Sequence, residues 1–203
     1  MTKKSITVPR SDEPTAPYHE IANNNGWKGT DTRVKARFAA AYNDRALIFL
    51  FQTEDAPRIC RHFGNQSAVS SDSCVEAFIE PAPGRPYYNI EVNISESINS
   101  SRRFGRPNPE RLTTDELDTI VRSVSQPQTT EIFEPGNHYS WTCRLEVPWA
   151  LLGVKPEPGM VLRANFYACS GDAEPPYYLT WAPIESAKPD FHRPEFFGDL
   201  VLE

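Results

Sequence analysis

The sequence predicts an all-β protein, built as an antiparallel two-sheet β-sandwich of the immunoglobulin-like or jelly-roll-like kind with one or two short helices. Nineteen prolines among 203 residues argue against a helical protein, as does the scarcity of long stretches with a 3.6-residue apolar period. Short runs rich in β-branched and aromatic residues recur instead, each bounded by Pro, Gly, Asn or Asp. Runs at this spacing, joined by turns, are typical of two packed sheets.

The expected strands follow one another along the whole chain, which predicts a single domain over residues 1–203. Residues 1–30 are expected to form an N-terminal arm that contributes the first strand and a buried Trp27. Alternation in the next run places Val34, Ala36, Phe38 and Ala40 on one face, and the run after it is apolar on both faces, as in a central strand. The expected strands are 5–8, 33–42, 46–52, 74–80, 87–95, 119–125, 139–148, 161–169, 177–183 and 198–203.

Two short helices are expected between these strands. Segment 113–120 reads TTDELDTI, in which Thr113 or Thr114 would cap the helix. In segment 148–153, Pro148 suits a first-turn position and Gly153 suits the end of a single helical turn.

Composition excludes several classes of protein. A formal charge of −6 argues against nucleic-acid binding, which requires a basic surface. No run of about 18 apolar residues occurs, so we expect no membrane span. No signal peptide is visible, so the chain is expected either to stay in the cytoplasm or to have lost a leader before residue 1.

The four cysteines are scattered and form no CxxC pair, unlike a zinc site or a disulfide-dense scaffold. We expect Cys60, Cys74, Cys143 and Cys169 to be reduced core residues, with one disulfide as the alternative in an exported protein.

The segment 87–95, YYNIEVNIS, indicates a binding face. Alternation directs Asn89, Glu91 and Asn93 to one side of the strand, and pairing through the Pro83-Gly84 turn adds Glu76 from the preceding strand. Such amides and carboxylates are good hydrogen-bonding partners for sugar hydroxyls. The alternative is a face that simply meets water, although Asn and Glu are unfavourable in strands.

Several segments in order, DSCVEAFIEP, YYNIEVN, ANFYACSGD, LTWAPI and FHRPEFFGDLVL, resemble the family 9 carbohydrate-binding modules over about residues 33–203. The resemblance implies a β-sandwich that binds sugars, often at chain ends, in a slot between two aromatic rings. It also implies attachment to a glycoside hydrolase such as a xylanase, and structural calcium. Glu76, Asn93 and Asn89 fall at polar sugar contacts of the family, and Phe191 falls at one of its sandwiching tryptophans.

The C-terminal segment FHRPEFF contains the other candidate binding groups. A sugar has apolar ring faces and polar edges, so its site needs an aromatic plate with hydrogen-bonding groups around it. Phe191 would be the plate, and His192, Arg193 and Glu195 would supply the polar groups. The alternative for Arg193 is an ion pair that holds the loop rigid. Phe196 and Phe197 are expected in the core.

Two departures from the family pattern affect this site. The second sandwiching ring should lie near residues 69–71, where this chain has Ser70 and Ser71. Glu91 also replaces a residue that is often basic in the family. One wall of the slot and one hydrogen-bond donor are therefore expected to be missing.

The 95–118 segment is expected to be a long loop, either solvent-exposed or folded over the polar face. In the second case Arg102, Arg103 and Phe104 would replace the missing ring and donor.

The tryptophans of the later strands are expected mainly in the core. Trp141 alternates with apolar residues and Trp149 begins a helical turn, so both are expected to be packed. Trp181 precedes the 184–193 loop and is expected either to pack in the core or to line the sugar pocket.

Non-catalytic binding of a mono- or oligosaccharide, in support of polysaccharide breakdown, is therefore the expected function. One alternative is a glycoside hydrolase that uses Glu76 and Glu91, although the sequence gives no sign of the apolar burial that would keep one of them protonated. The other alternative is a scaffold domain with a decayed sugar slot. The scattered histidines, and the lack of nucleophile, Walker or dinucleotide motifs, favour no other enzyme class.

Overall fold

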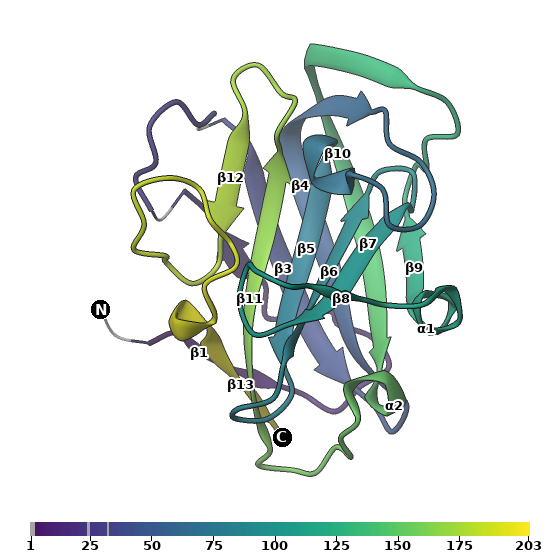
Figure 1. The fold of residues 1–203 in the computed structure, drawn as a ribbon, viewed down its shortest axis with the longest axis vertical. Helices are drawn as coiled ribbons and strands as arrows, with labels where there is room; N and C mark the ends of the chain where they lie inside the picture. The colour runs from purple at the N-terminus through teal and green to yellow at the C-terminus, as the bar shows by residue number, and fades with distance from the viewer. Residues whose placement is uncertain (1–2, 24, 32) are drawn as a thin grey trace.

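The computed structural model describes residues 3–23, 25–31 and 33–203 and confirms the predicted two-sheet sandwich (Figure 1). Among these residues the larger sheet has eight strands. Its spatial order is β1 (Ser5–Val8), β13 (Gly198–Leu202), β11 (Val161–Ser170), β5 (Cys74–Glu80), β6 (Tyr87–Asn93), β7 (Ile98–Arg103) and β8 (Glu110–Arg111), with β12 (Tyr177–Thr180) paired to β11. The smaller sheet has the order β2 (His19–Ile21), β3 (Lys35–Tyr42), β4 (Ala46–Cys60), β10 (Ile132–Pro148) and β9 (Val121–Val124).

The ladders are antiparallel, as predicted, with one exception that involves the chain ends. Strand β1 pairs in parallel with β13, from Ser5 opposite Asp199 to Val8 opposite Leu202. A parallel pair cannot be joined by a tight turn, and here the two partners come from opposite ends of the chain.

Both predicted helices are present, and their ends follow the expected chemistry. Helix α1 (Thr114–Asp118) begins after Thr113, which forms a capping box with Glu116. Helix α2 (Trp149–Leu152) is followed by Gly153 in the left-handed conformation, at φ 64°. Short 3₁₀ turns occur at η1 (Val69–Ser71) and η2 (Pro194–Phe196). No helix of the described residues is long and apolar enough to cross a membrane.

The main core lies between the two sheets. It contains a group of tightly packed rings, in which the Phe38 and Phe166 centroids lie 3.9 Å apart and Trp181 meets the edge of Phe38 at 5.8 Å. Trp141 and Trp149 are 2% and 3% exposed, as predicted. The four cysteines are free and buried, which confirms the expectation of reduced core residues.

A second apolar cluster lies on the outer face of the larger sheet, and we call it the outer aromatic cluster. It consists of Trp27, Val69, Cys74, Phe78, Tyr87, Tyr167, Cys169, Ile184, Phe191 and Phe197. The long segment between β12 and β13, residues 181–197, supplies its last three members and appears beside β11 in Figure 1. We call this segment the C-terminal loop.

The prediction of a long loop over residues 95–118 is wrong in part. Residues 98–103 form strand β7, which pairs along β6 from Ile98 opposite Val92 to Arg103 opposite Tyr87. Its sequence, INSSRR, is polar because alternate residues face the outer side of the sheet, where they contact other polar groups.

Candidate functional site

Strands β5, β6 and β11 bring the predicted polar residues onto one face. Glu76 of β5 lies directly opposite Glu91 of β6 and opposite Tyr167 of β11. Asn89 and Asn93 are at alternate positions on β6, facing the same side as Glu91. The predicted common face of these four residues is therefore confirmed.

A pocket of about 270 Å³ opens on this face, next to the outer aromatic cluster. Its chemically important lining consists of Glu76, Glu91, Arg106, Tyr178, Phe191 and His192. We call it the outer-face pocket. The Phe191 ring and the polar face of β6 share this cavity through Glu91, whereas the predicted amides of Asn89 and Asn93 do not line it.

The two carboxylates form the inner part of the pocket and are 3% and 5% exposed. Glu91 accepts hydrogen bonds from the amides of Asn89, at 2.8 Å, and Asn99, at 2.9 Å. Glu76 accepts one from the Cys169 thiol at 3.2 Å. Burial raises the pKa of both carboxyl groups; for Glu91 the two amide donors oppose the rise. The burial that the sequence did not indicate is thus present at both residues.

The aromatic part of the pocket contains Phe191, which is 9% exposed. One face of its ring is stacked on Tyr167, with centroids 4.1 Å apart and an interplanar angle of 10°. Tyr178 meets it edge-on at 6.1 Å and also lines the pocket. The predicted plate is therefore present as a supported wall, and sequence analysis missed Tyr178. The signal was available: Tyr177 and Leu179 face the main core, so alternation directs Tyr178 outward.

The 3₁₀ turn η1 lies where the family pattern places a second ring. Ser70 and Ser71 line the pocket there, together with Gly171 and Pro189. The Ser70 carbonyl accepts a hydrogen bond from the Gly171 amide at 3.0 Å, which holds the turn against the end of β11. Neither serine supplies a ring, but the Tyr178 hydroxyl comes close: a Cβ added at Gly171 would lie 3.6 Å from the Ser70 carbonyl oxygen and 3.7 Å from that hydroxyl oxygen.

His192 is held within the pocket as a neutral imidazole. Its Nδ1 lies 2.9 Å from the Tyr87 hydroxyl, and its ring centroid is 5.0 Å from that of Phe78. Burial lowers the pKa of His192 to about 3, assisted by the nearby charges of Arg103 and Arg106.

A cation reaches the pocket from the segment after β7. Arg106 lines the pocket and forms an ion pair with Asp190 of the C-terminal loop at 2.7 Å. Arg103 lies behind it, donating to the Asn89 carbonyl at 3.0 Å and to the Arg106 backbone carbonyl at 2.8 Å. The donor at the pocket is therefore Arg106, which the sequence analysis missed, and the predicted Arg103 lies behind it.

The other two residues proposed to cover the polar face do not do so. Arg102 donates to the Tyr88 hydroxyl at 3.2 Å and pairs with Glu116, both away from the pocket. Phe104 is 76% exposed and does not line the pocket. The prediction that this segment supplies a replacement ring is therefore wrong.

Three predicted site residues lie outside the pocket. The Asn93 amide donates to Asp72 at 2.7 Å and its carbonyl accepts from Ser95, so this residue holds the turn after β6. Trp181 is 2% exposed in the main core. Arg193 donates to Glu195 at 2.6 Å within the C-terminal loop. Alternation gave the face of Asn93 but not its distance from the pocket along the strand.

The remaining predicted residue, Asn89, supports the pocket without lining it. It is fully buried, and it connects Arg103 to Glu91 through its amide group. Of the predicted set, Glu76, Glu91, Phe191 and His192 line the pocket, and Asn89 and Arg103 position its charges.

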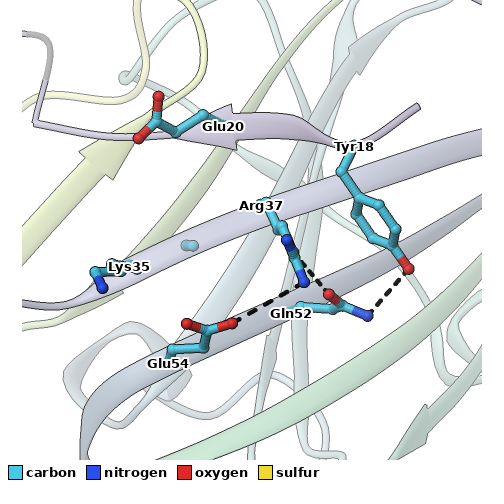
Figure 2. A pocket seen from close by; sticks show the side chains of 7 residues that line it. Tyr18, Glu20, Lys35, Arg37, Gln52 and Glu54 are labelled. Atoms are coloured by element: carbon cyan, nitrogen blue, oxygen red, sulfur yellow. Dashed lines mark hydrogen bonds and ion pairs between the residues drawn. The ribbon is translucent and has the colours of Figure 1, made fainter. Parts of the chain in front are cut away.

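A second hollow of about 300 Å³ lies on the outer face of the smaller sheet (Figure 2). Its ring, Tyr18, is covered by Arg37, whose guanidinium carbon lies 4.7 Å from the ring centroid. Figure 2 shows Gln52 bonded to both, receiving a hydrogen bond from Arg37 at 2.8 Å and donating to the Tyr18 hydroxyl at 3.0 Å. Because these groups satisfy one another, the outer-face pocket is the better candidate.

Comparison with known proteins agrees with the family resemblance seen in the sequence. A model described as "Carbohydrate-binding family 9" matches residues 11–202. A candidate carbohydrate-binding protein from Bacteroides uniformis ATCC 8492 has a TM-score of 0.88 at 23% identity, with 100% of both chains covered. No curated protein sequence matches the chain.

Two further structures share the fold at lower identity. Both are of a family 9 carbohydrate-binding module from Caldicellulosiruptor kristjanssonii. The complex with glucose has a TM-score of 0.63 at 13% identity, covering 98% of this chain and 96% of that one. The complex with cellotriose has a TM-score of 0.62 at 14% identity, covering 98% and 94%.

Proposed function

Because the chain belongs to carbohydrate-binding family 9, we propose that its outer-face pocket binds one terminal residue of a saccharide. Carbohydrate binding without catalysis is the function of this family. The proposal rests on one observation: a wall formed by Phe191 and Tyr178 borders the same small pocket as two buried carboxylates. Ligand pockets typically measure ~300–1,000 Å³, so about 270 Å³ favours a single sugar residue over a long stretch of chain.

The chemistry of the lining fits a sugar ring. The apolar face of a pyranose would pack against the Phe191 wall, which Tyr167 holds in place. Glu76 and Glu91 offer carboxyl oxygens to hydroxyl groups, and Arg106 offers donors. Because Asn89 and Asn99 already fix Glu91, little side-chain freedom would be lost on binding.

Calorimetric titration of the folded chain with glucose and cellotriose tests this proposal. Replacing Glu91 with Gln should weaken binding about 5- to 150-fold, because an unsatisfied buried partner costs ~1–3 kcal/mol. The matched control is Glu54→Gln in the hollow on the smaller sheet, which should leave binding unchanged. Equal affinity of the Glu91 variant and the wild type would contradict the assignment of the pocket.

The aromatic wall is tested by a second matched pair. Phe191→Leu should weaken binding about 2- to 12-fold, since an aromatic contact contributes ~0.5–1.5 kcal/mol beyond its buried area. Phe133→Leu replaces a partly exposed ring on β10 and serves as the control. If the folded wild-type protein binds neither sugar, the scaffold alternative replaces this proposal.

We further infer that the protein assists a separate glycoside hydrolase, as the sequence resemblance implies. Binding of one saccharide end would keep such an enzyme near its polymer. The alternative, hydrolysis by Glu76 and Glu91 themselves, is tested with an aryl glycoside: release of the aryl alcohol that is lost in Glu76→Gln would favour it. Our inference instead predicts no release by this chain and faster polymer degradation when a hydrolase is fused to it.

A further inference from the structure

Two thiols that the sugar-binding proposal does not explain lie beside the Glu76 carboxylate at the inner end of the outer-face pocket; of the two, Cys169 lines the pocket. Cys74 of β5 lies directly opposite Cys169 of β11, and Glu76 is two residues further along β5 on the same face. The two sulfurs and a Glu76 oxygen all lie within 4.8 Å of one another. Cys169 Sγ is 3.2 Å from Glu76 Oε1.

From this geometry we propose that Cys74, Glu76 and Cys169 bind a thiophilic divalent cation such as Zn²⁺. Zinc lies about 2.3 Å from thiolate sulfur and ~2.0–2.2 Å from carboxylate oxygen. In a tetrahedral site these lengths separate two sulfurs by about 3.8 Å. The three ligand atoms already lie within 4.8 Å of one another, and a bound metal would draw the sulfurs to this separation.

The pocket supplies what a three-ligand site still needs. Glu76 and Cys169 line the outer-face pocket, so the fourth coordination position faces a space that water or a ligand hydroxyl can enter. Three protein ligands and one open position are the arrangement of reactive rather than purely structural zinc sites.

The chemistry of the donors couples metal binding to proton release. All three groups are buried. A thiol binds zinc as the thiolate, so a bound divalent cation would displace the protons of Cys74 and Cys169, and its charge would compensate the negative charge left on the ligands.

The donor set selects the kind of metal. Two sulfur ligands suit zinc and other soft ions, whereas calcium takes six to eight oxygen ligands. This cluster therefore does not fit the calcium implied by the family resemblance, which stays a separate prediction. The cysteines are far apart in sequence, which explains why their spacing indicated no zinc site.

Cobalt titration of the reduced, chelator-treated chain tests the proposal directly. Co²⁺ should produce thiolate-to-metal charge-transfer absorption that saturates near one equivalent and is displaced by Zn²⁺. The isosteric change Cys74→Ser or Cys169→Ser should abolish this absorption, and Glu76→Gln should weaken Co²⁺ binding at least tenfold. Cys143→Ser, which changes a buried thiol of the main core, should leave the spectrum unchanged.

Circular dichroism spectra and melting temperatures distinguish a variant that has lost the metal site from a variant that has lost its fold. Zn²⁺ should raise the melting temperature of the wild type and of Cys143→Ser, but not that of Cys74→Ser. Absence of the charge-transfer band in the folded wild type, or an equal band in Cys74→Ser, would overturn the proposal. So would mass spectrometry that finds Cys74 and Cys169 joined by a disulfide in the protein as purified.

The sugar-binding and metal-binding proposals can be refuted independently of each other. Glu91→Gln should lose sugar affinity while keeping the cobalt spectrum, because Glu91 is outside the three-ligand set. Cys74→Ser should lose the cobalt spectrum while still binding glucose in metal-free buffer. A cobalt spectrum without sugar binding would leave the metal site standing, and the reverse result would leave the sugar site standing.

Discussion

The buried imidazole of His192 should make the stability of the protein strongly dependent on pH between about 6.5 and 3. Its pKa is lowered to about 3 by burial first and by the charges of Arg103 and Arg106 second, while Asp190 opposes the shift. An unfolded chain has a histidine pKa of about 6.5. In this window the unfolded state therefore binds one more proton at this residue than the folded state does.

The sign and size of the effect follow from this difference. Stability contributed by neutral His192 is fully present above pH 6.5 and is lost as the pH falls towards 3, at up to ~1.4 kcal/mol per pH unit. Between pH 6.5 and 4.5 the loss amounts to about 2 kcal/mol. Glu76 and Glu91 act in the opposite direction, because their raised pKa values favour protonation of the folded state.

Comparison with His192→Gln isolates the imidazole from these carboxyl groups. The measurement is urea denaturation, followed by tryptophan fluorescence, at several pH values from 7 to 4.5. The stability difference between wild type and variant should shift by about 2.5 kcal/mol in favour of the variant as the pH falls. Tyr87→Phe removes the hydroxyl next to Nδ1 but keeps the surrounding ring, so it should retain the wild-type slope. Parallel profiles of the wild type and His192→Gln would refute the argument.

Three further changes are expected to have measurable effects. Gly198→Ala should lower stability by about 1–3 kcal/mol in thermal denaturation, because a Cβ there would lie 2.5 Å from Trp181 Cζ3; an unchanged melting temperature would contradict this contact. Thr113→Ala removes the capping box of α1 and should cost about 1 kcal/mol in urea denaturation, whereas a neutral result would show that the cap contributes nothing. Arg163→Met frees the Pro194 carbonyl, now 2.6 Å from the guanidinium, and should accelerate proteolysis within the C-terminal loop; unchanged cleavage would show that other contacts hold it.

The strands that carry the site could be predicted because their signal is local. Segment 74–80 coincides with β5, and segment 87–95 contains β6, since period-two alternation and the Pro-Gly turn define them without knowledge of the rest of the fold. The family and its fold followed from the order of such segments and are confirmed by the family match. Strand β7 was missed because its buried positions include small serines in place of aliphatic residues.

The pocket itself could be predicted only in part, because its members meet through long-range contacts. Alternation gives the face of a side chain, but Asn93 contacts Asp72 from a distant segment, and no local pattern records that contact. Arg106 lines the pocket and pairs there with Asp190, which is far along the chain. Trp181, for which the sequence left both the core and the pocket open, turns into the main core.

The C-terminal loop connects the stability of the protein to the properties of the pocket. Tyr167 of β11 donates to the Phe191 carbonyl at 3.1 Å and fixes the loop to the sheet, and Trp27 of the N-terminal arm donates to the Ser186 carbonyl at 3.0 Å. Each fully buried phenylalanine ring contributes ~1.5–3 kcal/mol, so burial of Phe191 and Phe197 helps to hold the loop on the outer face.

The same covering determines the electrostatics beneath it. An outer sheet face that met water would leave Glu76 and Glu91 solvated, whereas the loop and the outer aromatic cluster exclude water from their sides and leave only the pocket open. Burial on this face raises the pKa of the two carboxyl groups and lowers that of His192, and the loop supplies both His192 and the Phe191 ring of the aromatic wall. It follows that changes which loosen the loop should alter ligand affinity and the pH dependence contributed by His192 together, whereas Glu91→Gln should weaken affinity and leave the His192 contribution in place.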